Sequence, residues 1–274
     1  QASVHLSLNS LDEYTTSLVK ATTEAYPPYQ EIGIQVNGEY RQLNDSLLQI
    51  ENEYYATMRP KRVAQSGERP SHALQERGVE YIEVRSLDLD PFLPVGIDED
   101  GIRFLDMMMI SCLLESSPPM DWDEFRRVRA TRNQIAERGR EPGLVITKAD
   151  GTRCSVERCG LEFIKYLEPL ADALSCGDGR YRVALENKRK LFEEPELTPS
   201  ARAMDGVHQH NDTFFYFAKA QAEHHEEIFK QASQDLQFAS QFEEEAAASL
   251  ERAKQMELAD DENFETFLDK YFER

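Results

Sequence analysis

Polar and apolar residues alternate along residues 51–59 and 79–85, and this alternation predicts two strands. Successive side chains of a strand point to opposite faces. One face would carry Glu51, Glu53, Tyr55, Thr57 and Arg59 in the first strand, and Val79, Tyr81, Glu83 and Arg85 in the second. We therefore expect each strand to bury its mostly apolar face and to present acidic, phenolic and cationic groups on the other.

Cap and turn signals place further elements around these strands. A capping box at Ser10–Glu13 predicts a helix that runs to about Ala25 and ends before the two prolines that follow. The dipeptide Asn37-Gly38 is a strong hairpin signal and predicts a turn between strands at 31–36 and 39–43. Together with the two strands above, these elements predict a mostly antiparallel sheet.

The pattern after this region is chiefly helical. We expect helices at 70–77, 101–116, 121–138, 158–175 and 180–193 and across 212–257, a small hairpin at 144–147 and 153–156, and a last amphipathic helix around Phe264–Tyr271. The fold class is therefore α+β. We expect two parts, a sheet-containing part at residues 1–98 and a mainly helical part at residues 99–274.

Composition narrows the classes of partner. The chain has 274 residues and a formal net charge of −20, which argues against nucleic acid and anionic membranes as partners. No apolar run is long enough to span a bilayer. Neither a GxxxxGK[ST] nor a GxGxxG motif is present, so a P-loop or a Rossmann nucleotide site has no support.

The four cysteines are Cys112, Cys154, Cys159 and Cys176, and they lack CxxC spacing. We expect reduced thiols of a cytoplasmic protein rather than a zinc site or a disulfide framework. Cys154 and Cys159 are close enough in sequence that a disulfide between them is the open alternative.

Glu83 and Arg85 are the strongest candidates for chemistry, because they lie two residues apart on one strand face. A carboxylate suits Mg²⁺, and a guanidinium suits a phosphate or a carboxylate. Arg59, Lys61 and Arg62 add a cationic cluster to an acidic protein, and an anion would explain it. The same pattern is also typical of an ordinary half-exposed hairpin with a cross-strand ion pair.

Two stretches in this region carry a family resemblance. The sequence QIENEYYATMRPKR at 49–62, followed by GVEYIEVRSLDLDPF at 78–92, resembles the central signature of bacterial glutamate–cysteine ligases. The chain resembles only the C-terminal half of that family. The resemblance implies ATP-dependent ligation of the γ-carboxylate of L-glutamate to L-cysteine through γ-glutamyl phosphate, the first step of glutathione biosynthesis. It also implies a sheet of the glutamine-synthetase type, whose carboxylates hold Mg²⁺ or Mn²⁺.

The resemblance assigns expected roles to individual residues. Glu83 matches a metal-ligand glutamate, and Glu53 is a weaker candidate of the same kind. Arg85 matches the catalytic arginine that touches the transferring phosphoryl group or the glutamate. Tyr55 matches a tyrosine of the cysteine pocket. Arg59 and Arg62 match the motif and are expected to face a nucleotide or another anion.

The family's remaining metal carboxylates lie in its N-terminal half. The chain begins with Gln1, and we read it as truncated or cleaved, with a mature secreted protein as the alternative. We expect the chain alone to lack ligase activity and to bind ATP weakly, and a separate N-terminal half is a candidate partner chain. Two other functions stay open: a ligase that couples glutamate to another amine, and a non-catalytic binding or regulatory module built on the acidic residues 212–274.

Overall fold

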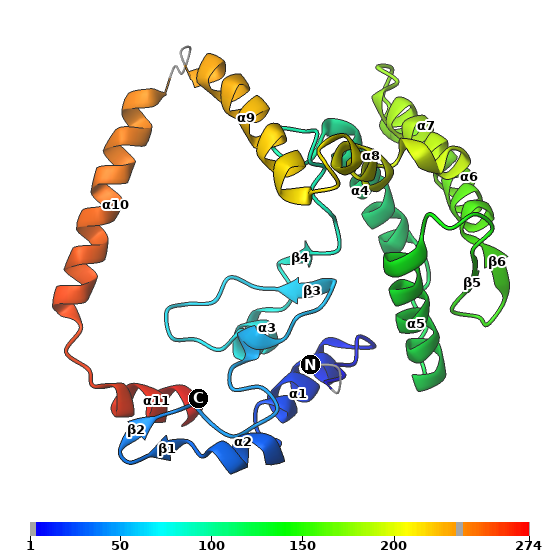
Figure 1. Cartoon of the computed structure of the whole chain (residues 1–274). Helices are drawn as coiled ribbons and strands as arrows, with labels where there is room; N and C mark the ends of the chain where they lie inside the picture. Colours follow the sequence, from blue (N-terminus) through cyan, green and yellow to red (C-terminus); the bar gives the residue numbers. More distant parts are fainter. Residues whose placement is uncertain (1–3, 234–237, 274) are drawn as a thin grey trace. The chain divides into compact units, whose positions relative to one another are not determined.

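The computed structural model describes residues 4–233 and 238–273 and contains two compact units (Figure 1). One unit combines Gln1–Leu87 with Gln237–Arg274, and the other is Asp88–Leu236. This grouping differs from the expected division after residue 98. The physical reason is the last helix, whose Phe264 ring meets the ring of Tyr40 edge-on at a centroid distance of 5.1 Å.

The first unit is built around a small apolar core. Its helices are α1 (Leu11–Ala21), α2 (Pro27–Ile32), α3 (Pro70–Arg77), α10 (Ala239–Ala259), α11 (Phe264–Glu273) and the 3₁₀ helix η1 (Glu51–Glu53), and its strands are β1 (Gln35–Val36), β2 (Glu39–Tyr40), β3 (Met58–Lys61) and β4 (Tyr81–Val84). The core consists of Val4, Leu6, Tyr14, Leu18, Ala21, Leu48 and Leu74. Helices α1 and α3 therefore meet through their apolar sides.

Near the start of the chain, the capping residues predict the observed structure better than the expected strand pattern does. The Glu13 N–H donates to Ser10 Oγ at 3.1 Å, as the capping box predicts. Helix α1 ends at Ala21, earlier than the expected end near Ala25. The prolines do not end it, because Pro27 stands at the first position of α2, where a proline is favoured. The expected strand at 31–36 is therefore wrong over its first half, and only Gln35–Val36 is extended.

The hairpin at Asn37-Gly38 is confirmed, with φ values of 56° and 82° that a type I′ turn requires. Val36 pairs with Glu39 in an antiparallel register. The single sheet expected from the sequence is wrong, because the described strands form separate two-stranded hairpins, β1–β2, β3–β4 and β5–β6. The α+β class holds, since these hairpins accompany a mainly helical chain.

Residues 51–53 form η1 instead of the expected strand, and the burial of Glu51 gives the reason. The Glu51 side chain is nearly inaccessible, and its carboxylate accepts Arg69 Nε at 2.9 Å and the Ser71 N–H at 2.7 Å. Arg69 also donates to Thr22 Oγ1 at 2.9 Å. This buried network connects η1, the start of α3 and the end of α1, so Glu51 does not share a strand face with Glu53.

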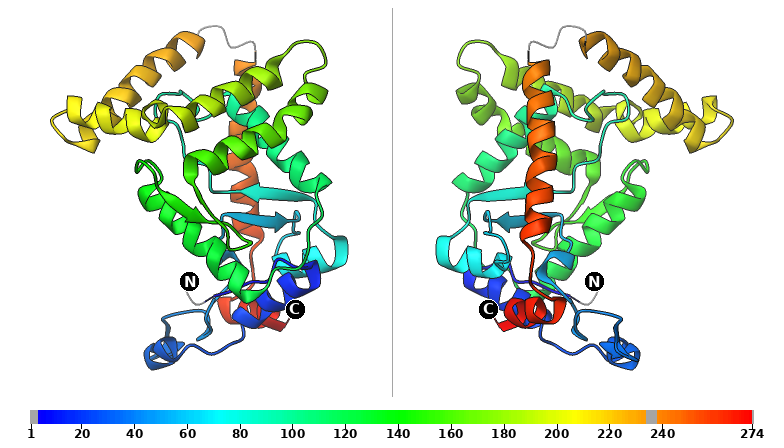
Figure 2. Two further views of the ribbon diagram at one scale, coloured as in Figure 1. Left: turned by 90° about the vertical axis from the view of Figure 1, so that its right-hand side faces the viewer. Right: turned by 90° about the vertical axis from the view of Figure 1, so that its left-hand side faces the viewer.

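The second unit is mainly helical, as expected. It contains α4 (Glu99–Leu114), α5 (Trp122–Arg138), α6 (Val156–Leu174), α7 (Arg180–Glu193), η2 (Pro195–Leu197), α8 (Pro199–Gln209), α9 (Phe214–Ser233) and the hairpin β5 (Val145–Thr147) and β6 (Arg153–Ser155). Its core consists of Met107, Ile164, Leu167, Ala171 and Leu185. Helices α6 and α7 lie side by side (Figure 2), and Gly160 admits the ring of Phe192, which a Cβ there would meet at 2.2 Å.

Cys154 and Cys159 form a disulfide, with Cα atoms 6.2 Å apart. The expectation of reduced thiols is therefore wrong for this pair, because β6 leads directly into α6 and brings both residues within bonding reach. Cys112 and Cys176 are free and exposed. Within residues 4–233 and 238–273, none of the helices combines the length and the apolar character that a bilayer crossing requires.

The Glu51–Arg69 network yields a stability prediction. Replacing Glu51 with Gln should lower the free energy of unfolding by roughly 3–5 kcal/mol, because Arg69 then stays buried without its charge partner. Urea unfolding followed by circular dichroism measures this loss. The control is Glu24→Gln, which removes an exposed ion pair with Lys20 and should change the free energy very little. An equal, small effect of both substitutions would contradict the structural role of Glu51.

Candidate functional site

Strands β3 and β4 carry most of the residues singled out by the sequence. They pair antiparallel with Arg59 opposite Glu83. Two backbone hydrogen bonds extend the ladder, from the Glu80 N–H to the Lys61 carbonyl at 2.9 Å and from the Arg85 N–H to the Thr57 carbonyl at 2.7 Å. The expected antiparallel pair is thus confirmed.

Burial on this hairpin does not follow the expected division into a buried apolar face and an exposed charged face, because the charged face includes both the buried Arg59 and the exposed Tyr81. Arg59 is only 7% exposed, whereas Met58 and Ile82 on the apolar face are 36% and 43% exposed. The charged face lies near the core of the first unit, where burial, followed by the charge of Tyr54, raises the pKa of Tyr14 to about 12. The positive charge of Arg59 acts in the opposite direction on the pKa of Tyr14.

Glu83 is surrounded by cations. Its Oε2 lies 3.1 Å from Arg59 Nη2 and 3.8 Å from Lys61 Nζ, and its Oε1 lies 3.0 Å from Arg85 Nη2. The hydrogen bond from Arg85, followed by that from Arg59, lowers the pKa of the Glu83 carboxyl below its usual value. Glu83 is therefore ionised at neutral pH, and the whole cluster has an excess of positive charge.

Arg85 and Tyr55 lie close together. The Arg85 guanidinium carbon lies 5.7 Å from the centre of the Tyr55 ring, within the range of a cation–π contact. Both side chains remain accessible, at 36% for Arg85 and 57% for the Tyr55 residue. The structure therefore presents a guanidinium and a phenol side by side on an accessible surface.

The structure places the other predicted residues differently. Arg59 is buried and donates from Nη1 to the Tyr54 carbonyl at 2.6 Å, so its guanidinium contacts groups of the chain itself. Arg62 is partly exposed and pairs with Glu80 at 3.6 Å. Glu53 lies in η1, and its carboxylate accepts the Gln49 N–H at 2.8 Å.

The residues of this chain do not by themselves fit a Mg²⁺ or Mn²⁺ ion at Glu83. Such an ion needs several oxygen ligands, but Glu83 brings one carboxylate whose oxygens already contact three cations. Among the residues that the structure describes, the one group of at least three His, Cys, Asp or Glu close enough for a metal is Glu68, His72 and Glu76. That group includes neither Glu83 nor Glu53.

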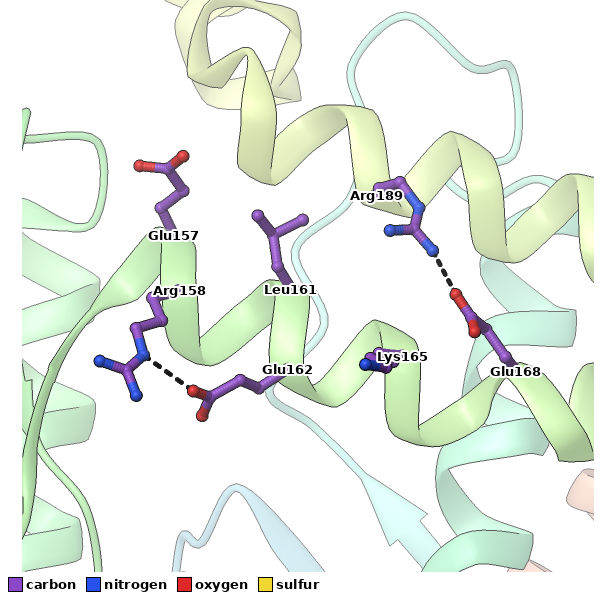
Figure 3. Close-up of a pocket in the computed structure, with 7 residues that line it drawn as sticks. All are labelled: Glu157, Arg158, Leu161, Glu162, Lys165, Glu168 and Arg189. Carbon is purple, nitrogen blue, oxygen red and sulfur yellow. Dashed lines mark hydrogen bonds and ion pairs between the residues drawn. The ribbon is translucent and has the colours of Figure 1, made fainter.

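A separate hollow of about 450 Å³ lies on α6 and α7 in the second unit (Figure 3). Charged side chains surround Leu161 there, and they pair with one another: Arg158 with Glu162 at 2.8 Å and Arg189 with Glu168 at 2.6 Å. None of the site residues predicted from the sequence lines it. These two ion pairs do not indicate a particular ligand.

The β3–β4 cluster comprises Tyr54, Tyr55, Arg59, Lys61, Glu83 and Arg85. Two of its members have no specific role predicted from the sequence. Lys61 lies on the same strand face as Arg59 and reaches Glu83, and the spacing of two residues could have identified it. The Tyr54 carbonyl, which anchors Arg59, carries no sequence signal, because every residue has a carbonyl group.

The poor fit to a metal yields a prediction for the chain alone. Its affinity for Mn²⁺ should be the same as that of the Glu83→Gln variant, because the three cations oppose an added divalent ion. Electron paramagnetic resonance of free Mn²⁺ measures this. The comparison is made in a His72→Ala background, which disables the Glu68–His72–Glu76 group. A site that disappears with Glu83→Gln would contradict the prediction.

Known proteins resemble this chain over its whole length. The family model for glutamate–cysteine ligase matches residues 1–135, which include the entire β3–β4 cluster. Glutamate–cysteine ligases of Pseudomonas entomophila and Azotobacter vinelandii are 39% and 41% identical over 99% of the chain, and the match covers 51% of each relative. A crystal structure of glutamate–cysteine ligase from Francisella tularensis in complex with AMP superimposes with a TM-score of 0.92 and 30% identity, over 100% of this chain and 54% of that one.

These matches agree with the resemblance that residues 49–92 indicate, and they extend it far beyond those motifs. The chain spans about half the length of the relatives that it matches. The chain is therefore similar to glutamate–cysteine ligases over nearly its whole length, and the match covers about half of each.

Proposed function

We propose that this chain supplies the Tyr55–Glu83–Arg85 part of the active site of a glutamate–cysteine ligase. In the proposed reaction, ATP phosphorylates the γ-carboxylate of L-glutamate, and the amine of L-cysteine then displaces phosphate from the acyl phosphate. The products are γ-glutamylcysteine, ADP and phosphate. A cytoplasmic location belongs to the same proposal. The observation that carries it is the contact of Arg85 with both Glu83 and Tyr55 on the accessible end of β4.

The accessible cations suit an anionic, phosphorylated substrate. Arg85 keeps part of its guanidinium exposed while Glu83 holds it, so it can meet a phosphoryl oxygen without reorganising. Phosphoryl transfer depends mainly on charge neutralisation and alignment, and an arginine contributes to both. Tyr55 beside it would line the pocket of the amine acceptor. The AMP complex of the Francisella relative supports nucleotide binding as part of this function.

Other parts of the proposed site must come from outside this chain. A two-stranded hairpin is marginal alone, and Met58 and Ile82 leave its apolar face open. We infer that strands equivalent to those in the rest of such a ligase extend β3–β4 into a sheet of the glutamine-synthetase type. The carboxylates of that part would supply the oxygen ligands that Mg²⁺ needs and that this chain lacks.

Reconstitution tests this function. The chain alone should show no formation of γ-glutamylcysteine, and addition of an N-terminal half from a relative should restore it.

In the restored complex Arg85→Lys should lower kcat by roughly a hundredfold, since a charge-stabilising group is misplaced. Arg41→Lys, an exposed residue paired with Glu39, is the control. Full activity of the lone chain, or equal activity of both variants, would refute the proposal. A panel of amines in place of cysteine distinguishes a ligase with another acceptor.

Helix α10 offers a surface for the same partner. All of its side chains are exposed. Phe242, Leu250 and Met256 fall on one side of the helix, next to the acidic run Glu243–Glu245. An isolated helix with an exposed apolar stripe is typical of a docking surface. We propose that this stripe binds the N-terminal half. The acidic C-terminal region would then serve as a docking surface within the ligase.

The stripe can be tested separately from catalysis. The double variant Phe242→Ser and Leu250→Ser should weaken binding of the N-terminal half at least severalfold, because both side chains lose apolar contact area. Isothermal titration calorimetry measures the dissociation constant. Leu258→Ser is the matched control, since Leu258 is equally exposed but lies on another side of α10. The stripe is not the docking surface if all these proteins bind with one affinity.

A further inference from the structure

The two arginines of the β3–β4 cluster differ in what their guanidinium groups can still contact. The Arg85 side chain is 36% exposed, and one of its nitrogens is held by Glu83. The Arg59 side chain is only 8% exposed, and all three of its nitrogens donate within the chain: Nε and Nη2 to Glu83 Oε2, and Nη1 to the Tyr54 carbonyl. Arg59 therefore has little capacity left for a ligand.

The contacts of Arg59 connect Glu83, Arg85, Tyr55 and Tyr54 into a closed ring of interactions, which we call the circuit. Arg59 holds Oε2 of Glu83 at 3.1 Å, and the other oxygen of Glu83 holds Arg85 at 3.0 Å. Arg85 in turn lies over the ring of Tyr55. The circuit closes through the backbone, because Tyr54, whose carbonyl accepts from Arg59 at 2.6 Å, immediately precedes Tyr55.

We propose that Arg59 is a positioning residue, which fixes Arg85 through Glu83 and fixes Tyr55 through the Tyr54 carbonyl, without touching substrate. The proposal rests on the proposed function for the roles of Arg85 and Tyr55, while the circuit itself is independent of that function. One buried side chain would thus align the group that meets phosphate with the group that meets the amine acceptor.

The circuit requires an arginine at this position. A guanidinium is planar, so it can address the Glu83 carboxylate with two nitrogens and the Tyr54 carbonyl with the third. A lysine at residue 59 would keep the charge but offers a single nitrogen. Lys61 cannot take over this role, because it lies 3.8 Å from Oε2 and is partly exposed. Arg59→Lys therefore separates geometry from charge.

The test uses the side-chain Nε–H signals of the ¹⁵N-labelled chain, assigned by the loss of one signal in Arg59→Lys and in Arg85→Lys. The Arg59 signal should exchange with solvent roughly tenfold more slowly than that of the exposed Arg41, because it is buried and hydrogen-bonded. In Arg59→Lys the Arg85 Nε–H should become more mobile, with a reduced heteronuclear NOE. Arg41→Lys should leave the Arg85 signal unchanged.

A double-mutant cycle shows whether Arg59 acts through Glu83. Glu83→Ala should mobilise Arg85 as much as Arg59→Lys does, and the double variant should mobilise it no further. The positioning role would be overturned if the two substitutions had additive effects on the mobility of Arg85, or if Arg59→Lys did not change the Arg85 signal. Glu83→Ala also keeps the proposal testable if Arg59→Lys does not fold, because it must then accelerate the exchange of the Arg59 Nε–H.

Titration with magnesium-free ATP distinguishes this inference from the proposed function. ATP should shift the Arg85 signal and leave that of Arg59 nearly in place. A shift of Arg59 as large as that of Arg85 would show direct contact and overturn the inference. If ATP moves neither signal while the mutant cycle gives the expected coupling, nucleotide binding by this chain fails and the positioning role stands.

Discussion

The candidate site depends on the pairing of one carboxylate with three cationic side chains. Glu83 divides its two oxygens between Arg59 and Lys61 on one side and Arg85 on the other. Without Glu83, three positive charges would face each other across a two-stranded hairpin. With it, the cluster keeps an excess of positive charge and a defined geometry, which are the properties that a site for a phosphorylated substrate requires.

This arrangement also explains how a charged side chain of the hairpin can be buried. Arg59 is only 7% exposed because its charge is matched by Glu83 and its remaining nitrogen by a backbone carbonyl. On the other face of the hairpin, the apolar side chains Met58 and Ile82 remain exposed. An exposed apolar face of this kind, like the stripe on α10, is typical of a surface that packs against another part of a protein. The relatives are about twice as long as this chain.

The sequence predicted the local features of the fold well. The cap at Ser10, the turn at Asn37-Gly38 and the helices α4 to α7 depend on neighbours in the chain, and the structure confirms them, whereas the sequence does not predict α8. The strand expected at Glu51 is wrong because Arg69, 18 residues away, holds its carboxylate through a contact that local patterning does not encode. The disulfide between Cys154 and Cys159 is the alternative that their spacing leaves open.

By itself, the sequence determined which residues of the site could share a face, because the alternation of a strand is a local property. Its motifs at 49–62 and 78–92 also indicate a resemblance to glutamate–cysteine ligases, and the family model of these enzymes matches residues 1–135. The tertiary structure alone decided which face turns toward the core and which arginine stays accessible. The physical reason is that burial of Arg59 requires acceptors from Tyr54 and from Glu83 on the facing strand, and only the folded chain brings these groups together.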